Sequence, residues 1–170
     1  MRLGRVLYLL LIALGIALPT RWWALEPIYI ASGSMEPTLP VGRHLFVDKM
    51  TLRFRAIRQG DIISFEAPAG ENRDMVKRVI ALPGQAVELR EKKVYVEGKL
   101  LDEPYARHKR GDERLQGDNL GPLLVPPRSY FVLGDNRDES DDSTVWRDSQ
   151  GQPLPFVPEK NIAGLVRGVY

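Results

Sequence analysis

The chain of 170 residues contains no cysteine and only two histidines. Without cysteine there are no disulfide bonds, no cysteine-ligated zinc sites and no thiol catalysis. His44 lies in a plain apolar stretch and His108 in a charged one, so neither indicates a metal site or a catalytic partner for a serine. The charges of the two signs nearly cancel, and the net charge of +2 gives no indication of a nucleic-acid partner. We therefore expect no metal, no cofactor and no bound nucleic acid.

Long apolar runs are also scarce, and the main one extends from Val6 to Leu18 behind Arg2 and Arg5. It is shorter than the roughly 20 residues of a typical spanning helix, so a cleaved secretory signal and a buried core helix are alternatives. No small-residue cleavage site follows, and Trp22 and Trp23 form the kind of aromatic pair found at membrane interfaces. We predict one uncleaved transmembrane helix in the cytoplasmic membrane, with its amino end cytoplasmic and the later residues outside the cytoplasm.

Thirteen prolines and fifteen glycines divide the remaining chain into short segments, which is typical of strands joined by turns. No long amphipathic helix is recognisable, and the predicted fold class is mostly β with antiparallel sheets. Residues 51–58 fit a short helix or a loop, and residues 102–122 are a charged excursion poor in large apolar side chains. The predicted strands are 26–31, 42–49, 62–66, 74–81, 86–89, 94–96, 129–133 and 162–169.

Residues 30–39 place two serines around a glycine and predict a tight loop. Gly33 has the backbone freedom for a sharp turn, and Pro37 restrains Glu36 to extended geometry. Nucleophilic serines are often held in such loops, so Ser34 is a candidate nucleophile. A surface turn of small residues is the alternative.

The predicted strand 74–81 carries a possible base for this serine. Alternation places Lys77 on one face with Met75 and Val79, while Arg78 faces elsewhere. Apolar neighbours exclude water from an amine, and burial lowers the pKa of lysine by up to about 3–5 units. A neutral lysine can activate a serine where no histidine is present. Two solvated surface charges are the alternative interpretation of this pair.

Four segments of the sequence resemble, in order, the motifs of bacterial type I signal peptidases (leader peptidases), which are serine/lysine-dyad membrane proteases. They are residues 32–39, 60–65, 75–79 and 134–143, and the similarity extends over the whole chain, most weakly at 102–122. The resemblance implies a membrane-bound serine endopeptidase, a hydrolase that removes N-terminal signal peptides from exported preproteins after small residues. Its partners would be those preproteins and the lipid bilayer, and we expect a monomer.

The resemblance also implies a role for each matching residue. Ser34 would be the nucleophile and Lys77 its general base, with an acyl-enzyme as intermediate. The hydroxyl of Ser32 and the backbone N–H of Ser34 would bind the oxyanion. Ser140 would orient Lys77, and Asp142 would support the last motif. The shallow substrate pockets would be formed by Ile28, Ile30, Met35, Leu39, Met75 and Val76.

Two positions depart from the family pattern. Thr144 stands where the family usually has an arginine, which puts a supporting salt bridge in question, and Ala31 replaces a common proline. The family fold is an antiparallel β-rich catalytic core with a small inserted β region. Applied here, it gives an anchor at 1–23, a first core part with the serine and lysine at 24–84, a reduced insertion at 85–128 and a second core part at 129–170.

Three alternatives stay open at this point. The same chemistry could serve one dedicated pilin-like or conjugation substrate, or self-cleavage as in related repressors, although an anchor argues against a repressor. An extracytoplasmic calcium-binding module is the third, because the acidic cluster faintly resembles an EF-hand loop with Ser143 at the glycine position. The cluster consists of Asp135, Asp138, Glu139, Asp141 and Asp142.

Overall fold

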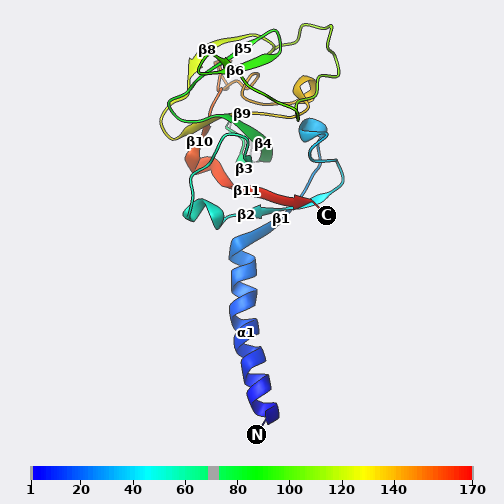
Figure 1. The fold of residues 1–170 in the computed structure, drawn as a ribbon, viewed down its shortest axis with the longest axis vertical. Coiled ribbons are helices and arrows are strands. Elements are labelled where there is room, and N and C mark those ends of the chain that lie inside the picture. Colours follow the sequence, from blue (N-terminus) through cyan, green and yellow to red (C-terminus); the bar gives the residue numbers. More distant parts are fainter. Residues whose placement is uncertain (1, 69–72, 170) are drawn as a thin grey trace.

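The computed structural model describes residues 2–68 and 73–169, and the side chains of 2–3, 16–24 and 169 lie outside the description. One helix, α1 (Arg2–Ala24), projects from a body of strands and short 3₁₀ turns (Figure 1). The 3₁₀ turns are η1 (Gly33–Met35), η2 (Thr51–Arg53), η3 (Arg137–Glu139) and η4 (Glu159–Asn161). The strands are β1 (Leu25–Tyr29), β2 (His44–Asp48), β3 (Ile62–Glu66), β4 (Asp74–Ala81), β5 (Ala86–Arg90), β6 (Lys93–Val96), β7 (Lys99–Leu100), β8 (Leu120–Leu124), β9 (Ser129–Leu133), β10 (Val157–Pro158) and β11 (Ile162–Val169).

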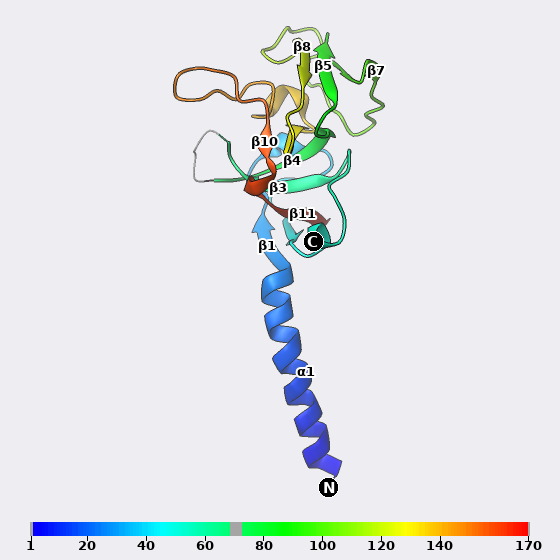
Figure 2. The ribbon, with the colours of Figure 1, turned by 90° about the vertical axis from the view of Figure 1, so that its left-hand side faces the viewer.

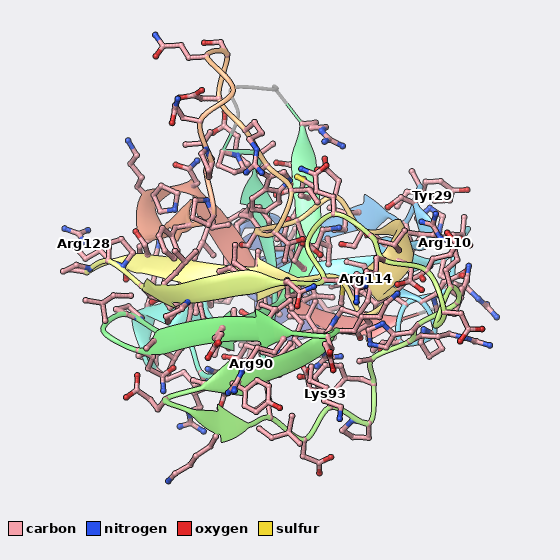
Figure 3. The ribbon with its side chains drawn as sticks, turned by 90° about the horizontal axis from the view of Figure 1, so that it is seen from above. Tyr29, Arg90, Lys93, Arg110, Arg114 and Arg128 are labelled. Atoms are coloured by element: carbon pink, nitrogen blue, oxygen red, sulfur yellow. The ribbon has the colours of Figure 1, made fainter. Side chains whose placement is uncertain are left out.

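These strands form two antiparallel sheets, which confirms the predicted mostly-β class. The first has the order β1-β2-β11-β3-β4-β9-β10, and the second has the order β7-β6-β5-β8. In two perpendicular views the second sheet lies on the side of the first sheet away from α1 (Figures 1 and 2). Figure 3 looks down on the second sheet, where Arg90 and Lys93 mark the β5–β6 hairpin and Tyr29 and Arg128 lie at opposite sides.

Three clusters of buried apolar side chains hold this arrangement together. One joins the two sheets, because Phe131 and Leu133 on β9 pack with Val87 on β5. Another holds the serine-bearing turn against β2, since Met35 packs with Leu45. Burying one such side chain contributes about 1.5–3 kcal/mol, so each cluster fixes its elements firmly.

The strands with the clearest alternation are predicted most accurately. The predicted bounds 62–66, 74–81, 129–133 and 162–169 are those of β3, β4, β9 and β11. The sequence does not predict β7, β8 or β10. Strand β8 contains Gly121 and Pro122, two residues that are uncommon in strands, and it begins within the charged excursion.

Helix α1 covers the predicted anchor. All its described side chains, at residues 4–15, are exposed. Among the described residues, no helix has the length and apolarity that crossing a membrane requires. The side chains of Arg2, Trp22 and Trp23, on which part of the anchor prediction depends, lie outside the description.

Candidate active site

The turn that carries Ser34 is a single 3₁₀ turn, η1, rather than a glycine-dependent turn. Ser32 before it is extended, with φ −125° and ψ 151°, and Glu36 after it is extended, as Pro37 predicts. Gly33 is not among the glycines of positive φ, so the expectation that it supplies an unusual backbone angle is wrong. A 3₁₀ turn reverses the chain with ordinary right-handed angles.

Asn136, which sequence reasoning missed, fastens this turn to the loop after β9. Its backbone N–H donates to the carbonyl of Ser34 at 3.1 Å, and its side-chain Nδ2 donates to the carbonyl of Gly33 at 3.0 Å. Asn136 is fully buried. The side-chain bond spans 103 residues of sequence, so no local pattern indicates it.

Ser34 and Lys77 meet in the folded chain although 43 residues separate them, and Lys77 Nζ lies 2.6 Å from Ser34 Oγ. Both are buried, with 7% of Ser34 and 3% of Lys77 exposed. As predicted, Met75, Lys77 and Val79 share the buried face of β4, while Arg78 faces elsewhere. The pairing of β4 with β3 and β9 holds the lysine at this position.

Burial lowers the pKa of Lys77 from its ordinary 10.5 to about 8. The nearby carboxylates of Asp142 and Asp141 oppose this shift, and the guanidinium of Arg73 adds to it. With a pKa of about 8, roughly one molecule in ten holds a neutral lysine at pH 7, against fewer than one in a thousand for an ordinary lysine. The site therefore contains a hydroxyl in direct contact with an amine that can accept its proton.

The lowered pKa of Lys77 predicts how the stability of the protein depends on pH. Between about pH 8 and pH 10.5 the unfolded chain binds a proton that the folded chain lacks, so stability rises with pH across this window. Below about pH 8 the amine is protonated in both states, and burying its charge lowers the free energy of unfolding by a constant amount, on the order of 3 kcal/mol. We expect Lys77→Met to raise the melting temperature at pH 7 and to lose most of that advantage by pH 10. Thermal unfolding followed by circular dichroism measures this, and an equal advantage at both pH values would contradict it.

Ser32 lies beside the nucleophile, with its Oγ 3.3 Å from Ser34 Oγ, and either hydroxyl can donate. Ser140 does not make its predicted hydrogen bond with Lys77, because its Oγ is buried without a hydrogen-bond partner in the described chain. The hydrogen bond of the Lys77 amine that the structure shows is the one to Ser34. Ser140 packs closely on Gly134, since a Cβ built there would overlap Ser140 Oγ.

Asp142 is buried at the centre of the last motif. One carboxylate oxygen accepts a hydrogen bond from the N–H of Gly134 at 3.0 Å. The other accepts from the N–H and from the hydroxyl of Thr144, the latter at 2.8 Å. Thr144 thus provides neutral hydrogen bonds to this carboxylate at the position where the family has an arginine.

A buried ion pair, which the sequence does not predict, holds the loop after β9 to β4. Arg78 donates from Nε and Nη2 to the two carboxylate oxygens of Asp135, at 2.8 and 2.6 Å. Thr38 also donates to Asp135, and the Arg78 guanidinium lies 3.9 Å from the ring centroid of Tyr105. The sequence gives one indication of this ion pair. It places Arg78 on the opposite face of β4 from Lys77.

The other acidic residues of this loop are also engaged in pairing. Asp138 accepts from Lys92 at 3.1 Å, and Asp141 forms an ion pair with Arg73. Within residues 2–68 and 73–169, no group of three acidic or histidine side chains is placed to hold a metal ion. The arrangement therefore gives the calcium-module alternative no support.

A cleft of about 270 Å³ opens next to Ser34 and Lys77. Its walls come from β1 and the start of β4. β4 pairs with β9 only from Arg78 onward, and within the described chain residues 74–77 have no strand partner on the side away from β3. β1 is the terminal strand of its sheet. The six predicted pocket residues all line this cleft, namely Ile28, Ile30, Met35, Leu39, Met75 and Val76.

Comparisons with known proteins identify relatives of this chain. The family model described as signal peptidase, peptidase S26, matches residues 3–170. A probable signal peptidase I-1 of Synechocystis sp. is 40% identical over 163 residues, covering 92% of this chain and 76% of the relative. A signal peptidase I of Bacillus licheniformis is 35% identical over 165 residues, covering 95% and 84%. The crystal structure of a signal peptidase I from Enterococcus faecalis V583 aligns with a TM-score of 0.50 and 30% identity, covering 66% of this chain and 98% of that one.

Proposed function

The chain belongs to the signal peptidase family, peptidase S26, and is a serine peptidase, and we propose that it removes N-terminal signal peptides from exported preproteins. In this proposal Ser34 is the nucleophile and Lys77 is its general base. The observation that carries the proposal is the 2.6 Å contact between Ser34 Oγ and the buried Lys77 Nζ. No histidine takes part, because the amine itself accepts the proton.

The chemistry follows from these two groups. Neutral Lys77 takes the proton of Ser34 while Oγ attacks the scissile carbonyl, and the same proton then passes to the leaving amine. The backbone N–H of Ser34 and the hydroxyl of Ser32 stabilise the oxyanion, and one such donor is worth about 2.7–4 kcal/mol. Lys77 then activates a water molecule, which hydrolyses the acyl-enzyme. Ser140 and Asp142 act as positioning residues, Ser140 through packing on Gly134 and Asp142 through its hydrogen bond to that residue.

We further propose that the substrate binds as an extended strand between β1 and residues 74–77 of β4. Both edges offer backbone groups for strand pairing, a common mode of peptide recognition. The buried side chains of Ile30, Met35 and Leu39 line the cleft. In this proposal they form shallow pockets that accept small side chains just before the cut.

The function is tested by offering a panel of unrelated preproteins to the purified full chain in detergent. We expect each to be cut once, after a small residue at the end of its signal peptide, as determined by mass spectrometry of the products. The Ser34→Ala variant prepared in the same way should cut none. Cleavage of a single preprotein in the panel would instead favour an enzyme dedicated to one pilin-like or conjugation substrate.

We propose that α1 anchors the chain in the cytoplasmic membrane with the sheets on its outer side. The support is its exposed apolar side chains at residues 6–14 and the basic residues at its start. The protein is expected to remain in the membrane pellet after washing at alkaline pH, with its sheets digestible by protease added outside the cytoplasm. A soluble processed form lacking the first residues would show that this segment is a cleaved signal.

A further inference from the structure

Arg73 lies at the end of the cleft that is farthest along β4 from Lys77. It precedes β4 directly and lines the cleft together with residues 74–77. The N–H of Ala67 donates to the carbonyl of Arg73 at 3.0 Å, so the antiparallel pairing of β3 with β4 continues to this residue. The backbone of Arg73 is therefore held in line with the strand that carries the proposed base.

The side chain of Arg73 lies on the face of β4 that also carries Lys77. Alternation along the extended chain places these two residues on one face and Asp74 on the other, where Val76 packs against the apolar pocket side chains. The ion pair of Arg73 with Asp141 agrees with this placement, because the carboxylate of Asp141 also acts on the amine of Lys77. The pocket side of β4 and the arginine side are thus opposite faces of the strand.

The guanidinium of Arg73 can bind an anion in the cleft. About half of the side chain is exposed, and its Nη2 donates to Oδ2 of Asp141 at 2.5 Å. A guanidinium has five N–H donors in a planar fork, so it can bind a second carboxylate while it holds the first. Since Arg73 lines the cleft, a group that enters the cleft contacts its guanidinium directly.

The proposed substrate strand brings one particular side chain to this guanidinium. The scissile carbonyl lies at Ser34 Oγ beside Lys77, and the residues before the cut run along β4 toward Arg73. The residue just before the cut places its side chain in the apolar pockets, so alternation turns the second and fourth side chains before the cut toward the opposite face. Each residue of a strand advances by about 3.3 Å, and of these two the fourth is the one that reaches Arg73.

We propose that Arg73 is a specificity-determining residue that binds an acidic side chain, aspartate or glutamate, at the fourth position before the cut. Asp141 holds the guanidinium in place when the cleft contains no substrate. The inference rests on the proposed function, because it uses the proposed path of the substrate. Asp74, the neighbouring carboxylate, lies on the opposite face of β4 and does not oppose this contact. Exposed ion pairs are weak, so the preference is expected to be roughly two- to five-fold.

Competition between substrates tests this inference with the full chain in detergent. One preprotein is prepared with glutamate, glutamine or lysine at the fourth position before its cut, and two versions at a time compete in one reaction. The product ratio from mass spectrometry is the ratio of their kcat/KM values. This ratio cancels any change in the pKa of Lys77, to which Arg73 and Asp141 both contribute. The same replacements at the fourth position after the cut are the matched control.

We expect the original chain to prefer glutamate over lysine roughly two- to five-fold, with glutamine between them. Arg73→Gln should remove this preference and Arg73→Glu should invert it. Asp141→Asn should increase it, because the competing carboxylate is gone. Added salt should weaken the preference in every case, since the groups are exposed.

Several outcomes would overturn the assignment of Arg73 and leave the proposed function intact. They are cleavage at the expected site without any preference, a preference that persists in Arg73→Gln, and a preference that appears only at the control position. Melting temperatures followed by circular dichroism confirm that the variants are folded. Failure of the original chain to cut any version of the preprotein would instead overturn the proposed function, and this inference with it.

Discussion

Ser34→Ala and Lys77→Ala are each expected to abolish preprotein cleavage while the chain stays folded. The first change removes the attacking oxygen, and the second removes the group that accepts its proton at 2.6 Å. Residues that act as one unit are strongly non-additive, so the double variant should be no slower than either single variant. We expect losses of several orders of magnitude in kcat/KM, measured on a purified preprotein in detergent. Circular dichroism provides the check on folding.

Lys77→Arg is the matched control for the role of proton acceptor. Arginine preserves the positive charge and a hydrogen-bond donor, but it stays protonated at every accessible pH. The variant should therefore be as inactive as Lys77→Ala. Additive losses in the double variant, or substantial activity of the arginine variant, would show that Lys77 acts by its charge and not as a base.

Gly134→Ala is expected to have the second-largest effect, because the added methyl group has no room. A Cβ at this position would overlap Ser140 Oγ and would lie 2.5 Å from the carbonyl oxygen of Ser34. Both approaches are far closer than normal contact, and one neighbour is backbone, which cannot rotate away. The serine turn must shift, and a misplacement of about 1 Å costs on the order of 100-fold in rate. Overpacking of this buried site should also lower stability by about 1–3 kcal/mol.

Gly121→Ala is a suitable control for this prediction. Gly121 also lacks a positive φ, and nothing lies within 4 Å of the position that its Cβ would take. We expect it to change neither kcat nor melting temperature appreciably. A folded Gly134→Ala variant with the kcat of the original chain would contradict the close packing described for the active site.

Local periodicity is sufficient to predict most of the strands, and the family motifs indicate Ser34 and Lys77 as the candidate pair. The same patterns do not predict which residues far apart in the sequence will contact each other. The pairing of Arg78 with Asp135 spans 57 residues, and the bonds of Asn136 to the serine turn depend on how β9 lies beside β4. The predicted special backbone angle at Gly33 is absent, because a 3₁₀ turn needs none. The predicted bond between Ser140 and Lys77 is not made, because Ser140 Oγ lies against Gly134 and has no hydrogen-bond partner in the described chain.

The central claim, that a neutral amine at position 77 is the base, is tested most directly by removing that amine and restoring it chemically. Lys77→Cys would contain the only thiol of the chain, which can be aminoethylated in the unfolded state before refolding. Original protein taken through the same treatment is the control. We expect Lys77→Cys to be inactive and the aminoethylated protein to cleave preproteins again.

The pH dependence of kcat/KM completes this measurement. For the original chain the rate should rise with pH around pH 8, as Lys77 loses its proton. In the aminoethylated protein the thioether sulfur withdraws electrons from the amine and lowers its pKa, so the rise should move to lower pH. The mechanism predicts that the aminoethylated protein is active and that its kcat/KM rises at a lower pH than that of the original chain. A restored amine without activity, or a rise that stays in place when the amine is changed, would contradict the assignment of Lys77 as the base.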